Sequence, residues 1–205
     1  MNKTTTTLKI LTAALAIVAL AGCNTLSRQA ESSSMIVIES VTGTTTEGTT
    51  VAFLQSDVQR TGTSGAYVQA DTATANIVVR LVNPDPINGP SQFNDVVLTT
   101  YRVTYELPTG PGTPGVDVPL PFDGNFSTAL CPVDETTAVP FIVVLEAAKL
   151  SAPLAGLVGT TTVLERRARI EIFGHDLTDH PVQATGYLTV YFADYMEPGG
   201  PAPKR

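Results

Sequence analysis

Residues 97–107 read Val-Leu-Thr-Thr-Tyr-Arg-Val-Thr-Tyr-Glu-Leu, and this stretch gives the clearest indication of the fold class. Every second residue from Val97 to Leu107 is apolar, aromatic or threonine, and Arg102 and Glu106 lie between them. Successive side chains of a β-strand point to opposite faces, so a period of two predicts a half-buried antiparallel strand. The β-branched and aromatic residues agree, because they pack well on a pleated sheet.

The same alternation recurs in residues 75–81, 164–172 and 182–192. Shorter strands are predicted between turn-forming residues, at Met35–Val41, Val51–Val58, Val116–Leu120, Phe126–Leu130 and Val139–Glu146. About nine short strands at this spacing predict an all-β fold, a single antiparallel β-sandwich over residues 35–195. Only residues 147–157 hint at helix, and Pro153 limits that helix to about one or two turns.

The stretches Val96–Leu107, Arg169–Phe173 and Gly186–Asp194 resemble the immunoglobulin-like or fibronectin type III-like modules of bacterial envelope proteins. The chain has no Trp and no Cys pair to bridge two sheets, which excludes an antibody-type domain. The step Phe192-Ala193-Asp194-Tyr195 is similar to the last strand of uncharacterised bacterial lipoproteins, and that likeness implies no function.

The first residues predict export. Lys3 and Lys9 precede an almost wholly apolar run, Ile10–Ala21, which is the pattern of a secretory signal. A transmembrane helix is the alternative, but it needs about 20 apolar residues, and this run is shorter.

The run ends in Leu20-Ala21-Gly22-Cys23, which resembles the lipobox of bacterial lipoproteins at all four positions. The resemblance implies cleavage before Cys23 and lipidation of its thiol. Residues 1–22 are then a signal peptide and 23–34 a lipidated tether. Separately, residues 196–205 are predicted to be a disordered tail, because three prolines and two glycines there cannot build a core or a sheet. Because Asn24 is not aspartate, the resemblance implies the outer membrane of a Gram-negative cell, or the plasma membrane of a Gram-positive one.

Charge excludes nucleic acid as a partner. Without Lys3 and Lys9 of the signal, ten basic residues face nineteen acidic ones, so the net charge is −9. An acidic chain is repelled by phosphate backbones.

Cys131 is left without an intramolecular partner if Cys23 carries lipid. The favoured interpretation is a small buried residue; the alternatives are an intermolecular disulfide or a catalytic thiol. Asp134 and Glu135 disfavour the last, because they would raise the pKa of the thiol.

Both histidines of the chain lie in one predicted hairpin, residues 174–181, which contains His175, Asp176, Asp179 and His180. Two imidazoles and two carboxylates suit Zn²⁺ or Ca²⁺. Asp and Thr are also ordinary turn residues, because their side chains bond the local backbone. The turn is favoured, so no metal or other cofactor is assigned; a metal-dependent binder or enzyme using this hairpin is the alternative.

The proline-rich loop 107–122 holds five prolines and three glycines. The favoured interpretation is a stiff crossover between the sheets, filled by Val116, Val118, Leu120 and Phe122, and the alternative is a recognition surface. Glu165, Arg167, Arg169 and Glu171 share one face of a strand and predict a solvated surface with cross-strand charge pairs.

No catalytic residue is assigned. The chain has no Gly-x-Ser-x-Gly elbow, no Gly-rich phosphate loop and no Walker lysine. The sequence therefore predicts a non-catalytic envelope module, held to the membrane by lipid, that binds an envelope protein or glycan through its loops or an edge strand.

Overall fold

The computed structural model describes residues 32–83 and 89–195, apart from the side chain of Thr128. The chain divides into two units, Met1–Ser32 and Ser33–Arg205. The predicted signal peptide, the lipidated Cys23, most of the tether and the tail lie outside the described residues. The second unit contains all of the strands described below.

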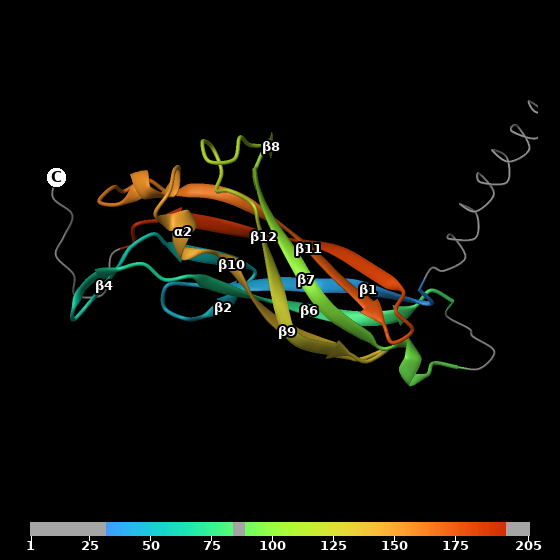
Figure 1. The fold of residues 1–205 in the computed structure, drawn as a ribbon. Helices are drawn as coiled ribbons and strands as arrows, with labels where there is room; N and C mark the ends of the chain where they lie inside the picture. The colour runs from blue at the N-terminus through green and yellow to red at the C-terminus, as the bar shows by residue number, and fades with distance from the viewer. Residues whose placement is uncertain (1–31, 84–88, 196–205) are drawn as a thin grey trace, which may run out of the picture. The chain divides into compact units, whose positions relative to one another are not determined.

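Seven long strands build two sheets that pack face to face (Figure 1). The first sheet contains, in spatial order, β10 (Thr136–Val144), β6 (Asp71–Leu81), β1 (Ser34–Thr44) and the short β2 (Thr50–Val51). The second contains, in spatial order, β3 (Phe53–Asp57), β12 (Pro181–Ala193), β11 (Leu164–Asp176) and β7 (Val96–Leu107). Beyond β7 lie β8 (Gly110–Pro111) and β9 (Phe122–Cys131), which pair with different parts of β7. A separate small hairpin is formed by β4 (Arg60–Gly62) and β5 (Gly65–Tyr67).

This strand order is immunoglobulin-like. The first, second and fifth long strands form one sheet, and the third, fourth, sixth and seventh form the other. The predicted all-β sandwich is confirmed, with twelve strands in the described residues rather than about nine. Five of the twelve have five residues or fewer, too short for an alternation to be recognised. One pairing differs from the antiparallel prediction, because β3 lies parallel to β12.

The inner faces of the two sheets form the core. Ala75, Ile77 and Val79 of β6 are buried, as the alternation predicts. The same holds for the inward residues of the last two strands, namely Ala168, Ile170, Ile172, Leu188, Val190 and Phe192. Burying the valine, leucine, isoleucine and phenylalanine side chains of this set contributes about 1.5–3 kcal/mol each, which makes this face the main source of stability.

In β7, a β-bulge reverses which alternate side chains face the core. Tyr101, Val103 and Tyr105 are buried as predicted, but before them Val96 and Leu98 face the core instead of Val97 and Thr99. The register of β7 against β9 and β11 shifts between Leu98 and Thr100. A bulge inserts an extra residue and so reverses which side chains point inward.

The predicted crossover at residues 107–122 is wrong, and so is the strand Val116–Leu120. The loop connects β7 to β9, which are neighbours in one sheet. Of the predicted filling residues, Val118 is buried and Phe122 is partly buried, whereas Val116 and Leu120 are exposed. Backbone hydrogen bonds from Val116, Asp117 and Val118 to Thr113 O fold the segment into a turn, so it stays outside the sheet.

Across residues 32–83 and 89–195 helix is confined to short pieces, and the short helix predicted before Pro153 is confirmed. The pieces are the one-turn α2 (Glu146–Lys149) and two 3₁₀ turns, η2 (Gln92–Asn94) and η3 (Leu154–Leu157). In the described part of the chain, no helix has the length and apolar character needed to cross a membrane.

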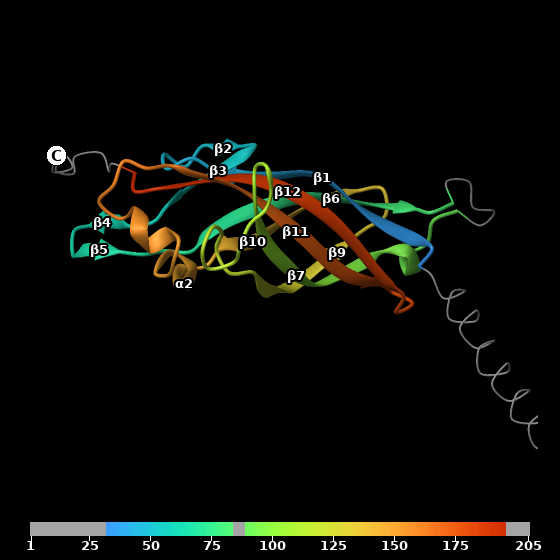
Figure 2. The ribbon, with the colours of Figure 1, turned by 90° about the horizontal axis from the view of Figure 1, so that it is seen from above.

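The sandwich has two distinct ends. The start of β1, η2 and the turn between β11 and β12 lie together at one end, and α2 with the β4–β5 hairpin lies at the other (Figures 1 and 2).

Candidate functional site

The predicted metal candidates lie in a tight turn between β11 and β12. Asp176 is buried, and its Oδ1 accepts hydrogen bonds from Thr178 N at 2.9 Å, Thr178 Oγ1 at 2.7 Å and His180 N at 3.0 Å. Asp179 has a φ of 71°, a left-handed conformation that Asp tolerates. Asp176 therefore organises the turn.

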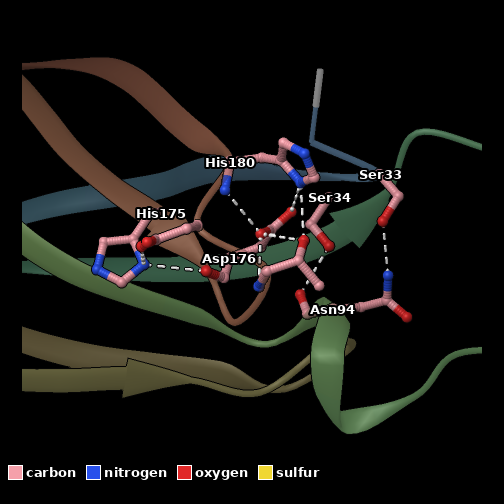
Figure 3. A network of polar contacts seen from close by, with 8 residues as sticks. Ser33, Ser34, Asn94, His175, Asp176 and His180 are labelled. Atoms are coloured by element: carbon pink, nitrogen blue, oxygen red, sulfur yellow. Dashed lines mark hydrogen bonds and ion pairs between the residues drawn. The ribbon is translucent and has the colours of Figure 1, made fainter. Parts of the chain in front are cut away.

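The two imidazoles engage different carboxylates. His175 Nδ1 lies 3.4 Å from Asp179 Oδ1, and His180 Nδ1 lies 3.5 Å from Asp176 Oδ2. Figure 3 shows the two rings on either side of Asp176, pointing apart. Among the described residues, no three His, Cys, Asp or Glu side chains are grouped so that they could hold a metal ion. The geometry agrees with a turn, and the absence of a bound metal stays a prediction.

The same turn is joined to the beginning of the sandwich. Ser34 Oγ donates to Asn94 O at 2.6 Å, and Asn94 Nδ2 donates to Ser33 Oγ at 2.7 Å (Figure 3). Leu177 N donates to Asp95 O at 3.1 Å. The first residues of the domain, η2 and the β11–β12 turn are thus one hydrogen-bonded unit.

A groove opens between the two sheets, where β9 and β10 form their outer strands. We call it the β9–β10 groove. Its volume is about 540 Å³, within the range of small-molecule sites. Its lining is uncharged: Thr72, Tyr101, Asn125, Phe126, Ser127, Ala129, Leu130, Thr137, Ala138, Val139, Pro140, Phe141 and Ile142.

Tyr101 lies at the base of this groove. Its ring centroid is 5.0 Å from that of Phe126 and 5.3 Å from that of Phe141. The ring occupies the space where a Cβ at Gly124 would stand, so β9 needs a glycine there. Burial raises the pKa of the Tyr101 phenol, and the hydrogen bond from Ile142 N, at 3.2 Å, lowers it in part.

The outer edge of β10 is poorly suited to pairing with another strand. Ile142 N is already bonded to Tyr101 Oη, and Pro140 has no N–H to donate. Edge strands are commonly protected in this way. A partner in the groove would therefore be recognised by side chains rather than by strand addition.

The sequence pattern does not predict this groove, because the groove depends on which strands are outermost in the two sheets. Two local signals were present, namely a glycine inside the strand Phe122–Cys131 and a proline inside Thr136–Val144. Glycine within a strand marks a close approach, and proline marks an edge.

The sequence pattern also does not predict a buried polar cluster around Lys149. Lys149 Nζ lies 2.8 Å from Asp71 Oδ2 and donates to Asp57 O at 2.7 Å. Ser56 Oγ donates to Asp71 Oδ2 at 2.6 Å. The cluster joins α2 to β3 and β6, which is a structural connection at the end opposite Ser33.

The predicted charged face is confirmed. Arg167 of β11 pairs with Glu106 of β7 at 2.6 Å across the strands, and Arg169 pairs with Glu171 of its own strand at 2.8 Å. The guanidinium of Arg167 also lies 5.0 Å from the ring centre of Tyr187. Exposed pairs of this kind stabilise a fold only slightly.

Cys131 is fully buried at the end of β9, so its interpretation as a small buried residue is confirmed. Burial raises the pKa of its thiol, and a hydrogen bond with Thr137 lowers it in part. A thiol held in its protonated form is a poor nucleophile.

No protein-family model, curated protein sequence or solved structure matches the chain. The fold alone therefore defines the class of protein: an immunoglobulin-like β-sandwich with an uncharged groove between its outer strands.

Proposed function

We propose that the chain is an envelope lipoprotein whose sandwich is a non-catalytic binding or structural module. The observation that carries the proposal is Leu20-Ala21-Gly22-Cys23, directly after the apolar run and ten residues before Ser33, where the folded unit begins. Cys23 carries the lipid, and Asn24 favours the outer membrane over inner-membrane retention. Two or three acyl chains suffice for stable anchoring, whereas one chain is marginal.

The β9–β10 groove is the proposed binding surface. Its aromatic, hydroxyl and amide side chains are uncharged, which suits a neutral stretch of an envelope protein or glycan. Edge protection at Pro140 and Ile142 supports recognition by side chains.

The anchor is tested by Cys23→Ala. The wild-type chain is expected to incorporate a labelled fatty acid and to sediment with membranes. The variant is expected to lose the label and to leave the lipid fraction. Equal labelling of both proteins would refute lipidation at Cys23.

The groove is tested by a photoreactive amino acid placed at Leu130 or Ile142, both exposed in the groove. Tyr187, exposed on the face of β12, is the matched control. We expect one product captured from both groove positions and absent from Tyr187, and we expect Leu130→Asp to abolish its capture from position 142. Capture that does not depend on position would contradict it.

A further inference from the structure

One end of the sandwich exposes three large apolar side chains that come from separate segments. Val82 follows β6, Phe93 lies in η2 and Leu177 lies in the β11–β12 turn, and they are 59%, 56% and 44% exposed. Single exposed apolar residues are ordinary on protein surfaces. These three share a location, and we call them the apolar rim.

Hydrogen bonds fix the apolar rim around Ser33. Val82 N donates to Ser33 O at 2.9 Å, and Ser33 Oγ accepts from Asn94, the neighbour of Phe93. Leu177 N donates to the carbonyl of Asp95, the next residue along. Figure 3 shows Ser33, Ser34 and Asn94 beside the turn that carries Asp176. The three segments that carry the apolar rim are therefore connected to one another near Ser33, the point at which the chain enters the domain.

The length of the tether brings this end close to the membrane, if the chain is anchored through Cys23 as the proposed function requires. Nine residues, 24–32, separate Cys23 from Ser33. Even fully extended, that stretch spans at most about 36 Å. A connection of this length holds the Ser33 end near the membrane at an effective concentration on the order of millimolar, so a weak apolar contact is enough.

We propose that the apolar rim contacts the surface of the bilayer that holds the lipid, so that the sandwich stands with its Ser33 end on the membrane. Moving apolar side chains from water to the boundary between headgroups and acyl chains lowers the free energy of the system. The α2 end, with the β4–β5 hairpin, then points away from the membrane (Figures 1 and 2).

The ionisable groups close to the apolar rim include Asp95, whose Oδ1 accepts a hydrogen bond from Val133 N at 3.0 Å, and two pairs of side chains. Arg80 lies 2.7 Å from Asp134, and His175 lies 3.4 Å from Asp179. Neither pair presents an isolated positive charge to anionic lipid. The contact is therefore apolar, and because carboxylates outnumber cations here, we expect anionic lipid not to strengthen it.

The chain contains no Trp, so one introduced Trp reports on a single position. The test uses the full lipidated chain in phosphatidylcholine vesicles with and without brominated acyl chains, which quench Trp on contact. Phe93→Trp places the reporter on the apolar rim, and Leu177→Trp is a second reporter if the first disturbs η2. Tyr67→Trp, at a residue 47% exposed in β5 at the opposite end, is the control.

The expected result is at least twofold quenching of the apolar-rim reporters by brominated lipid, with the Tyr67→Trp emission unchanged. Absent quenching at the rim, or equal quenching at both ends, would overturn the proposed contact. Flotation and intact mass separate this failure from failure of the anchor. A lipidated protein that floats with vesicles but shows no rim quenching refutes only the contact, whereas an unlipidated protein that does not float refutes both proposals.

Discussion

Lys149 Nζ lies 2.8 Å from Asp71 Oδ2 inside the protein, where the two side chains are 0% and 6% exposed. Lysine is almost never fully buried unless it is paired. The pair connects the only α-helical turn of the described residues to the first residue of β6. Removing Lys149 leaves the Asp71 carboxylate in a poorly solvated place with only the Ser56 hydroxyl, at 2.6 Å, and the more distant Arg60, at 3.8 Å.

We therefore expect Lys149→Met to lower the free energy of unfolding by about 3–5 kcal/mol. Urea denaturation followed by circular dichroism measures this change. Arg80→Met, which breaks the exposed pair with Asp134, is the control and should cost less than about 1 kcal/mol.

The double variant Lys149→Met with Asp71→Leu should lose much less than the sum of its single variants, because neither member of the ion pair is then left buried without the other. Additive losses would show that the two side chains do not depend on each other.

Gly124→Ala is expected to lower the free energy of unfolding. The added Cβ overlaps the Tyr101 ring, and overpacking of this kind costs about 1–3 kcal/mol. Gly156→Ala is the matched control, because a Cβ there meets nothing within 4 Å. Thermal unfolding compares the two, and equal melting temperatures would contradict the placement of Tyr101 against β9.

We expect the buried phenol of Tyr105 to make the fold less stable at alkaline pH. Its hydroxyl donates to Val143 O, and burial raises its pKa far above the ordinary value of 10.0. Above that value the unfolded chain releases the phenolic proton while the folded chain keeps it, so stability falls as pH rises. Below it the contribution is fully present.

Tyr105→Phe should cost about 0.5–1.5 kcal/mol at neutral pH through the lost hydrogen bond, and should flatten the alkaline decline. Denaturant midpoints measured across that pH range test this. An unchanged decline in the variant would assign the alkaline loss to other groups.

Asp176→Ala should lower the free energy of unfolding by at least about 2 kcal/mol, because three hydrogen bonds to the turn lose their acceptor. Asp179→Asn keeps a residue that tolerates the left-handed backbone and should change stability by less than about 0.5 kcal/mol. If a chelator lowered the melting temperature of the wild-type protein as much as Asp176→Ala does, the turn would be a cation site instead.

The period of two was sufficient to predict the sandwich, because one buried face forces alternation along a strand. Ala75, Ile77 and Val79 show this directly. The bulge after Leu98 could not be predicted in the same way, since it depends on how β7 pairs with two neighbours at once.

Residues that act through distant partners were also beyond local patterns. Lys149 lies 78 positions from Asp71 in the chain, and its burial follows only from the meeting of β3, β6 and α2. The β9–β10 groove likewise needed the strand order. The turn at Asp176 was predictable because its bonds are local, within four residues.

We propose that this sandwich is tethered to a membrane through Cys23, and mass spectrometry of the N-terminal peptide, on protein taken from native membranes, measures the tether itself. We expect a mature chain that starts at Cys23 and carries acyl groups. An N-terminus at Met1, or a Cys23 without lipid, would contradict it.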